Sequence, residues 1–583
     1  TINQKNLINE LGCGNCHLGA EQSSLIPLRA PDLSSSGSKY NSSFIYDYLK
    51  EPHSVRKNIG LSRMPNFNLS DDNIKKIVFY EKPFRAWLNI LKYSIKNNSI
   101  LNELTRNYFK NIWKSSIVFS YDLSKYLKVS SKKILYCDHH LSHTLSGAYY
   151  NNLNPITSIV VDGFGDESTT SIHHVKSLKE INNIWSSPFP HSLGLFYSAI
   201  TDYLGFSVND GEYKVMGLAA YGEPKYYEAL SKTIFFKDGK LIIDEKYYDY
   251  CRSVQRSYSK KLNNLFEVKE RESNLPLDLG SDNFKEYADI ASSAQKIIEN
   301  ILKEIFLYAH KLTGEKRFLF SGGVAMNSLA INQIAKLDFV EEIIIPPSPG
   351  DSGAAIGAAY FGFLNSNKSL NDFENRLDKI LAPGFVNNEQ VKEDFILTNY
   401  EKIADKESII DVAAEIISKN HVIATCYKNI ETGPRALGHR SMICNAHSLS
   451  AVKHLNEKIK KRSKFRPVAP VTLIDDANKY FILSDKIYKS YFYMGSVAEV
   501  SNSKNIEAVV HKDNTARVQI CDENHILGKI LSKLKKNNID VLANTSFNIS
   551  SDPIVYSLED AYLAIERMNI KYFLTENGMY KKK

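Results

Sequence analysis

The fold of this chain is decided by the stretch Ile159-Val160-Val161-Asp162-Gly163-Phe164-Gly165-Asp166. Its apolar residues indicate a buried strand, and the glycines and acids that follow indicate a tight turn at the end of that strand. Because Gly163 and Gly165 carry no side chain, the backbone amides of this turn can approach a phosphate closely. Asp162 could hold a metal-bound water or orient a nucleophile. The stretch therefore predicts a phosphate-binding turn after a central strand.

The same design recurs further along the chain, in Phe318-Leu319-Phe320-Ser321-Gly322-Gly323-Val324-Ala325-Met326-Asn327. A third glycine-rich turn, Pro349-Gly350-Asp351-Ser352-Gly353, also carries an acid. The three turns resemble the nucleotide cleft of the actin-like and sugar-kinase-like ATPases, in which two lobes clamp ATP between glycine loops. This resemblance implies an α/β domain whose nucleotide contacts are Asp162, Gly163, Gly165, Gly322, Gly323 and Asn327.

Two histidines precede the first strand, in Asp138-His139-His140-Leu141-Ser142-His143. His139 and His143 are four residues apart in a segment that we expect to be helical, so they share one helical face. Asp351 is placed to complete a site of two histidines and one carboxylate, which suits a divalent metal such as Fe, Mn or Zn. The alternatives are a structural histidine pair and an ordinary turn aspartate.

The run Gly211-Glu212-Tyr213-Lys214-Val215-Met216-Gly217-Leu218-Ala219-Ala220-Tyr221-Gly222 lies between the two strands. Glu212 and Lys214 are expected to make polar contacts with the nucleotide in the cleft. The alternative is a surface ion pair, which would contribute little to stability.

The final third of the chain begins near Ile380 and contains a predicted buried strand, Val422–Cys426. Cations beside glycines, prolines and buried strands suit a compact phosphorylated acid such as carbamoyl phosphate. A merely basic surface is disfavoured, because these cations do not stand in solvated runs. The expected contacts are Arg435, Lys460, Arg462, Arg517 and Ser546.

With the early motif Phe79-Tyr80-Glu81-Lys82-Pro83-Phe84, these runs resemble the O-carbamoyltransferase family of nodulation proteins and antibiotic biosynthesis. The resemblance covers essentially the whole chain after that motif. It implies an actin-like ATPase domain, expected at residues 73–370, and an α/β domain similar to threonylcarbamoyl-AMP synthases, expected at residues 380–583.

The resemblance also implies a reaction. The C-terminal domain would bind carbamoyl phosphate and ATP and form carbamoyl-adenylate, and the N-terminal domain would pass the carbamoyl group to a hydroxyl of a small molecule. The metal ligands, by match, are His139, His143 and Asp351, and the carbamoyl phosphate contacts are the five residues named above. A sugar-containing acceptor is favoured, but its identity and the oligomeric state are left open by the sequence.

The first 72 residues follow a different pattern. Cys13-Gly14-Asn15-Cys16-His17 is the C-x-x-C-H motif for covalent attachment of c-type haem, with His17 as the proximal ligand. Met64 supplies a second axial ligand. Residues 1–72 therefore resemble a small all-α class I cytochrome c, and the alternative is a chance motif.

Family members open with a β-hairpin whose histidine-aspartate-serine loop is the first phosphate-binding element. That hairpin is absent here, and the cytochrome c-like segment stands in its place, with the join around Asp72 to Phe79. We therefore expect the transfer domain to lack its opening strands, while adenylate formation by the C-terminal domain can persist alone. A fusion of two unrelated proteins would explain this order.

Two competing functions follow from the same residues. One is a haem electron carrier fused to an inactive carbamoyltransferase relic. The other is a tRNA threonylcarbamoyladenosine enzyme, which shares both folds. Residues 211–221 and 433–441 favour a carbamoyltransferase, and the absence of a strongly basic tract argues against tRNA or other nucleic acid as a partner.

The composition of the chain limits the number of domains and the class of protein. A chain of 583 residues with 43% hydrophobic and 24% charged residues indicates two to four globular domains. The net charge of +8 fits anionic ligands. We expect no membrane span and no secretory signal, which favours the cytoplasm, whereas covalent haem attachment would imply the periplasm. Outside the haem motif, the scattered cysteines indicate reduced thiols.

Overall fold

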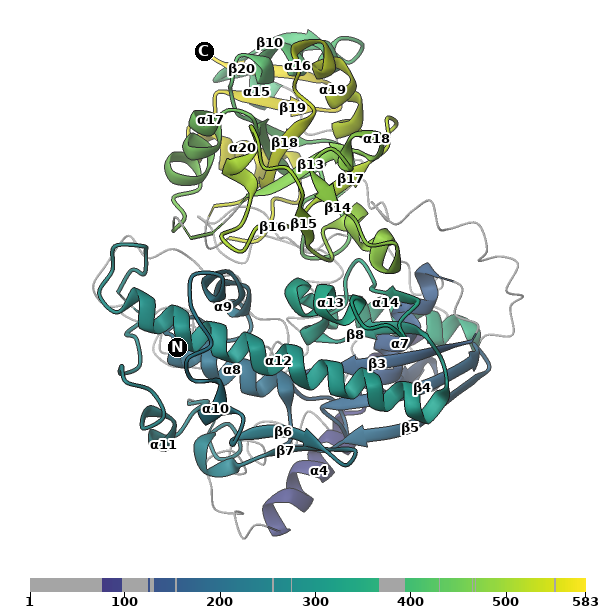
Figure 1. Ribbon diagram of the computed structural model, residues 1–583. Helices are drawn as coiled ribbons and strands as arrows, with labels where there is room; N and C mark the ends of the chain where they lie inside the picture. Colours follow the sequence, from purple (N-terminus) through teal and green to yellow (C-terminus); the bar gives the residue numbers. More distant parts are fainter. Residues whose placement is uncertain are drawn as a thin grey trace, which may run out of the picture.

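The computed structural model describes residues 76–96, 124–125, 130–151, 155–253, 256–273, 275–365, 394–428, 430–463, 465–466, 468–549 and 552–583. Figure 1 shows two α/β bodies, which we call the N-terminal part (residues 76–365) and the C-terminal part (residues 394–583). The expectation of a multidomain α/β protein is thus confirmed. The expected haem ligands Cys13, Cys16, His17 and Met64 lie outside the described residues, so the cytochrome c-like segment stays a prediction.

The N-terminal part is built on a five-stranded sheet with the order β5-β4-β3-β8-β9. The strands β3, β8 and β9 are parallel, so their carboxyl ends lie at one edge, and each leads into one of the three predicted glycine-rich turns. Every residue of β3 is buried, as the apolar run predicts. The bounds are β3 (Ile156–Val161), β4 (Thr170–Ser177), β5 (Glu180–Ser187), β8 (Arg317–Ser321) and β9 (Glu342–Ile344).

Two helices pack closely at this edge, α7 (His139–Tyr150) and α14 (Asp351–Leu364). A Cβ added to Gly357 of α14 would lie 1.7 Å from the carbonyl oxygen of Ser142 in α7. The glycine therefore allows backbone-to-backbone contact between the helices. As a result, the first turns of both helices meet at the ends of the parallel strands.

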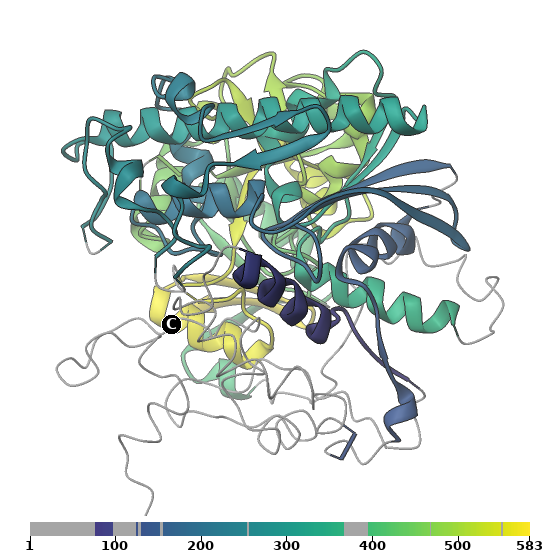
Figure 2. The same cartoon turned by 90° about the horizontal axis from the view of Figure 1, so that it is seen from below.

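The other elements surround this centre. The long helix α12 (Phe284–Thr313) runs across the N-terminal part in Figure 1, and α4 (Pro83–Lys96) crosses the side turned away from the C-terminal part in Figure 2. A short parallel pair is formed by β1 (Ile77–Phe79) and β2 (Ile134–Tyr136). The remaining elements are α8 (Leu193–Tyr203), α9 (Glu212–Ala219), α10 (Tyr227–Leu230), β6 (Ile234–Lys237), β7 (Lys240–Ile243), α11 (Lys260–Asn263) and α13 (Ser328–Ala335).

The C-terminal part is built on an eight-stranded mixed sheet with the order β10-β20-β19-β11-β12-β18-β13-β17. The predicted strand at Val422–Cys426 is confirmed as β11 (Ile423–Cys426). The other strands are β10 (Tyr400–Asp405), β12 (Ser441–Asn445), β13 (Ala469–Leu473), β17 (Gln519–Cys521), β18 (Val541–Ser546), β19 (Tyr572–Thr575) and β20 (Gly578–Lys582).

Apolar side chains on both faces of this sheet are covered by helices. The helices α16 (Ile409–Ser418) and α19 (Ile526–Leu534) share one buried cluster, and α20 (Leu558–Met568) packs on the other face. A small sheet points toward the N-terminal part in Figure 1, with strands β14 (Phe481–Ile482), β15 (Ala498–Val500) and β16 (Thr515–Ala516). Short helices complete this part: α15 (Asp394–Leu397), α17 (Leu449–Lys453) and α18 (Ile474–Ala477).

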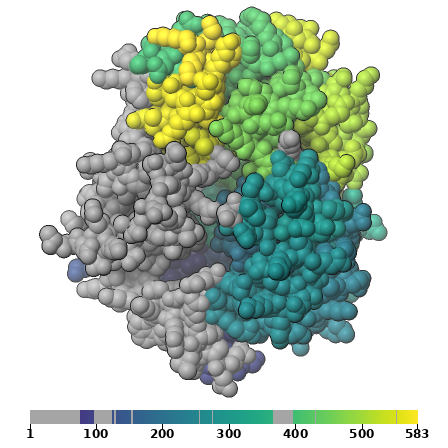
Figure 3. All heavy atoms as spheres, turned by 90° about the vertical axis from the view of Figure 1, so that its left-hand side faces the viewer, coloured from purple at the N-terminus to yellow at the C-terminus, as the bar shows by residue number. Residues whose placement is uncertain are grey.

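The two parts touch directly, as Figure 3 shows from one side. The Tyr493 hydroxyl of the C-terminal part donates to the Ile345 carbonyl, and the Lys336 ammonium lies 2.6 Å from the Glu499 carboxylate. None of the described helices combines the length and the apolar character that crossing a bilayer requires.

Candidate metal centre and anion site

Two histidine nitrogens converge at the first turn of α7. Asp138 caps this helix by accepting from the Leu141 amide, which fixes the turn that carries His139. The Nε2 atoms of His139 and His143 are 3.3 Å apart, and both rings are buried. Two nitrogens bound about 2.1 Å from one tetrahedral ion would be about 3.4 Å apart. The predicted shared face is confirmed, and its spacing fits two ligands of one metal.

Two carboxylates complete the cluster. Asp351 Oδ1 lies 3.7 Å from His139 Nε2 and 3.5 Å from His143 Nε2. Asp162 Oδ2 lies 3.6 Å and 3.1 Å from the same two atoms. Ligand atoms of all four residues fall within 4.8 Å of one another. Asp162, expected as a nucleotide contact, therefore lies with the candidate metal ligands, and half-exposed Asp351 leaves the cluster open on its side.

The charges in this cluster favour a cation. Burial works to raise the pKa of Asp162, but hydrogen bonds from His139 and His143 outweigh it and hold that pKa well below its usual range. Burial works to lower the pKa of His139, and the carboxylates of Asp162 and Asp351 outweigh it and raise that pKa to about 9. The polar neighbours of Asp162 Oδ2 are therefore the imidazole nitrogens of His139 and His143, at 3.6 and 3.1 Å. This donor set fits a divalent cation, which would bind the histidines as neutral imidazoles.

Residues around the ligands hold them in place. The Asp166 carboxylate accepts from the His139 amide at 2.9 Å and from the Lys82 amide at 2.6 Å, which joins the early motif to α7. Ser321 Oγ lies 3.4 Å from His143 Nδ1. Glu81 Oε1 lies 4.0 Å from His139 Nδ1. Our sequence reasoning did not predict Asp166, Ser321 or Glu81 as site residues, although each lies within a run that it singled out.

The four predicted nucleotide-binding glycines lie around the candidate metal centre. The Gly163 amide donates to Asp162 Oδ1 at 2.8 Å. A Cβ on Gly323 would lie 3.1 Å from the same oxygen, and one on Gly165 would lie 3.0 Å from His139 Cδ2. Gly322 has φ of +91° and approaches the Val161 backbone. These positions keep bare backbone beside the ligands.

The other predicted nucleotide contacts have partners elsewhere. Asn327 caps α13 by accepting from the Ala330 amide and exchanges hydrogen bonds with Gln295. The Glu212 carboxylate accepts from Ser198 Oγ and from the amides of Asn209 and Gly211. The Lys214 ammonium lies 5.6 Å from the centre of the Phe206 ring.

A second site lies in the C-terminal part, where Lys460 is buried. Its ammonium donates to the carbonyls of Ser546 and Asn548 at 2.9 and 2.6 Å, and to Asn548 Oδ1 at 2.6 Å. Ser546 Oγ donates to Asn548 Oδ1 at 2.7 Å. Burial, with help from Arg462 and Arg466, holds the pKa of Lys460 well below its usual range. Lys460 thus orders the turn that presents the predicted Ser546 hydroxyl.

Beside Lys460 is the arginine cluster, which we define as Arg435, Arg462, Arg466 and Arg517. Burial lowers the pKa of Arg435 to about 10, and burial and Arg466 lower that of Arg462 to about 9. Burial and Arg435 hold the pKa of Arg517 well below its usual range. Within the described chain, no carboxylate forms an ion pair with these arginines, and the Nε atoms of Arg462 and Arg517 are buried without a partner. Partly buried cations without a carboxylate partner fit an anionic ligand.

The loop that carries Arg435 is built around one carboxylate. Glu431 Oε1 accepts from the amides of Leu437, His439 and Arg440 at 2.8, 2.7 and 3.0 Å. The sequence analysis did not predict Glu431 as a site residue. An acid before a glycine- and proline-containing loop was the available signal.

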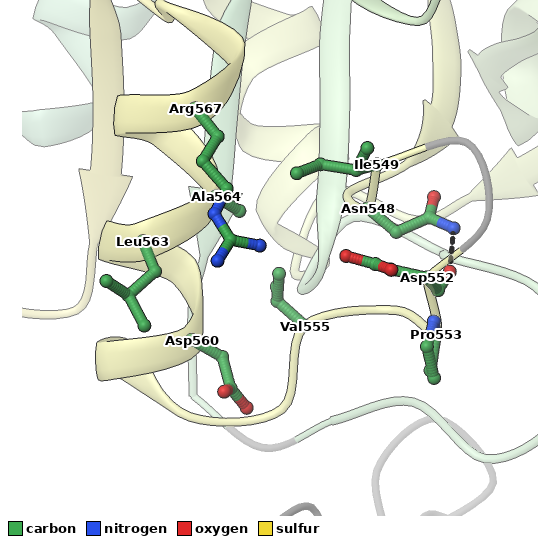
Figure 4. Close-up of a pocket in the computed structure, with 9 residues that line it drawn as sticks. All are labelled: Asn548, Ile549, Asp552, Pro553, Val555, Asp560, Leu563, Ala564 and Arg567. Atoms are coloured by element: carbon green, nitrogen blue, oxygen red, sulfur yellow. Dashed lines mark hydrogen bonds between the residues drawn. The ribbon is translucent and has the colours of Figure 1, made fainter. Parts of the chain in front are cut away.

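Two cavities adjoin these sites. One of about 30 Å³ lies beside Asn548, between Asp552 and Arg567 (Figure 4), and has room only for water. Another, of about 360 Å³, lies between α13 and the β14-β15-β16 sheet. Its lining is mixed and contains the acids Glu299, Glu499 and Asp513, the cation Lys336 and the amide of Asn332.

Two known protein families match this chain, one over each part. Residues 64–360 match the family described as Carbamoyltransferase N-terminus, and residues 414–582 match the family described as Carbamoyltransferase C-terminus. The first match begins at Met64, inside the segment expected to be cytochrome c-like. Together the matched ranges contain both sites.

Relatives cover most of the chain. The nodulation protein NolO of Bradyrhizobium diazoefficiens is 30% identical over 73% of this chain and 75% of its own. The nodulation protein NolNO of Sinorhizobium fredii is 28% identical over 78% of this chain and 65% of its own. A solved structure of HypF from T. kodakarensis is 17% identical over 45% of this chain and 39% of its own, but its TM-score of 0.24 supports no argument.

Proposed function

We propose a specific reaction for this chain, which belongs to the carbamoyltransferase family and is a carbamoyltransferase. In this reaction the carbamoyl group of carbamoyl phosphate is transferred to a hydroxyl of a small molecule. The transfer uses ATP and passes through carbamoyl-adenylate. We further propose that the N-terminal part is an actin-like ATPase domain and the C-terminal part a threonylcarbamoyl-AMP-synthase-like domain. The observation that carries the proposal is the partly buried arginine cluster, which lacks carboxylate partners among the described residues.

The arginine cluster suits carbamoyl phosphate for two reasons. A phosphate group offers three oxygens, and planar guanidinium groups bind such oxygens through paired hydrogen bonds. The unpartnered Nε atoms of Arg462 and Arg517 supply donors for them. The Ser546 hydroxyl, held by the Lys460 turn, adds a neutral group for the carbamoyl end.

The proposed first stage forms carbamoyl-adenylate, and its atoms balance only if one water molecule takes part. Water splits carbamoyl phosphate into carbamate and phosphate. A carbamate oxygen then attacks the α-phosphorus of ATP, the bond from that phosphorus to the bridging oxygen breaks, and pyrophosphate leaves. The arginines offset the negative charge that this stage gathers on the phosphates.

The proposed second stage takes place at the metal centre. His139, His143, Asp162 and Asp351 fit a divalent cation, which when bound would offset charge on the nucleotide phosphates. The chain's own contribution is the glycine backbone at Gly322 and Gly323, which packs against the Val161 backbone and the Asp162 carboxylate and so holds that carboxylate beside the other ligands. The acceptor oxygen bonds to the carbamoyl carbon, AMP leaves with the electrons of the broken bond, and the hydroxyl proton passes to solvent.

The 360 Å³ cavity is the proposed place of the acceptor. Asn332 lines it, is 9% exposed and has no side-chain hydrogen-bond partner within the described part of the chain. Glu499 is paired with Lys336, but the carboxylates of Glu299 and Asp513 favour a hydroxylated compound with a positive amino group. The cavity lies close to the arginine cluster, because Arg517 Nη2 donates to Ser328 Oγ at 2.8 Å. Leu329, which follows Ser328, and Thr515, two residues before Arg517, both line the cavity.

Mass spectrometry of the nucleotide products tests the proposal. Purified protein with ATP and carbamoyl phosphate is expected to form carbamoyl-AMP and pyrophosphate, and omission of carbamoyl phosphate should abolish both. Formation of ADP instead of AMP derivatives would contradict an adenylate route. With an amino sugar as acceptor, Asn332→Leu should raise the acceptor KM and leave pyrophosphate release unchanged.

A further inference from the structure

Helix α9 of the N-terminal part reaches the arginine cluster of the C-terminal part. Arg466 Nη2 donates to the Tyr213 hydroxyl at 2.9 Å, and the Arg466 guanidinium lies 4.9 Å from the centre of the Tyr213 ring. One turn further on, Met216 Sδ lies 3.9 Å from Arg517 Nη2. One side of the proposed carbamoyl phosphate site is therefore made by the other part of the molecule.

The position of Tyr213 is fixed by the residues before it. Glu212 accepts from two backbone amides and Ser198 Oγ, which holds the start of α9. Gly211 allows the turn to lie against Phe206, since a Cβ there would be 2.6 Å from Phe206 Cβ. Tyr213 thus leaves a built turn and extends across the boundary between the parts.

The phenol is also electrostatically close to other members of the cluster. Burial dominates and lowers the pKa of both Arg435 and Arg462, and Tyr213 acts on each in the opposite direction. Tyr213 therefore stands near at least three arginines that the proposed ligand would contact.

We propose that Tyr213 is a positioning residue of the anion site and acts through Arg466. A guanidinium has five N–H donors in one plane. Tyr213 takes one donor and covers one face, so the plane of Arg466 is set and its other donors can face a phosphate. The site is then complete only when the two parts are docked. This inference rests on the proposed function for the identity of the ligand as carbamoyl phosphate.

The first test is the kinetics of pyrophosphate release by the full chain. Tyr213→Phe keeps the ring and removes the hydroxyl, and it is expected to raise the KM for carbamoyl phosphate about tenfold, as for loss of a hydrogen bond to a charged group. The kcat at saturation and the KM for ATP should change little. Tyr227→Phe is the matched control, because its hydroxyl accepts from Asn300 within the N-terminal part. An unchanged carbamoyl phosphate KM in Tyr213→Phe would overturn the inference.

A double-mutant cycle tests action through Arg466. The effects of Tyr213→Phe and Arg466→Lys should be strongly non-additive in carbamoyl phosphate KM. Additive effects would show that the two residues act separately and would contradict the proposal.

Calorimetry with inorganic phosphate separates this inference from the proposed function. If phosphate binding weakens in Tyr213→Phe while the wild type releases no pyrophosphate, the inference stands and the proposed function fails. A second outcome is that the wild type and Tyr213→Phe bind phosphate equally well while Arg435→Ala does not bind it. In that case the inference about Tyr213 fails and the proposed function stands. If the wild type binds neither phosphate nor carbamoyl phosphate, both fail.

Discussion

Gly433 of the C-terminal part lies against Pro347 of the N-terminal part, so closely that a Cβ on the glycine would be 2.3 Å from the Pro347 carbonyl oxygen. Gly433 opens the loop that carries Arg435, and Pro347 belongs to the turn that delivers Asp351. This backbone contact therefore connects the loop of the arginine cluster to the turn of the candidate metal centre.

Gly433→Ala tests this contact. Its φ of +97° and the close carbonyl both disfavour a side chain, so we expect a loss of about 2 kcal/mol in the free energy of unfolding. Both pyrophosphate release and carbamoyl transfer should fall. Gly280→Ala is the control, because a Cβ there meets nothing within 4 Å. Equal denaturation midpoints for the two variants would contradict the contact.

The metal centre is tested by metal content. Asp162→Asn and His143→Gln each remove one ligand of four, so each should lower the bound divalent metal, measured by elemental analysis, by tenfold or more at equal free metal. The comparison variant is His310→Gln, whose ring stacks on Phe339 elsewhere in the N-terminal part. Full metal content in Asp162→Asn would show that Asp162 is not a metal ligand, and would favour the nucleotide contact that the sequence suggested.

The sequence predicts part of this centre, and the limits have physical causes. His139 and His143 could be paired in advance because helical spacing is local. Asp162 could not be distinguished from a phosphate contact, because its direction depends on how β3, α7 and α14 pack. The sequence drew attention to Glu212 and Lys214, whereas their neighbour Tyr213 faces the arginine cluster. Adjacent helical residues point in different directions, and only the docked parts show which one crosses the interface.

Stability in acid depends on Asp540, which precedes the strand that leads to Ser546. Burial works to raise the pKa of Asp540, but hydrogen bonds from His447, Tyr480 and Lys479 outweigh it and lower that pKa to about 2, below the ordinary 3.8. The ionised carboxylate therefore stabilises the fold above about pH 4, and this contribution is lost as the pH falls through about 2.

Asp540→Asn should accordingly lower the free energy of unfolding by about 1–2 kcal/mol at neutral pH. The difference from the wild type should shrink below pH 4 and vanish near pH 2. Urea denaturation across this pH range is the measurement. A difference that does not change with pH would show that the Asp540 charge is not responsible.

The central claim is tested most directly by carbamoyl-phosphate-dependent release of pyrophosphate from ATP, without any acceptor. The wild type and Lys458→Ala, which removes an exposed lysine two residues before Lys460, should release pyrophosphate at the same rate. Arg435→Ala should release it at least a hundredfold more slowly, as for loss of about 3 kcal/mol of charge stabilisation. Equal rates for Arg435→Ala and the wild type, or no release from folded wild-type protein, would contradict carbamoyl-adenylate formation at the arginine cluster.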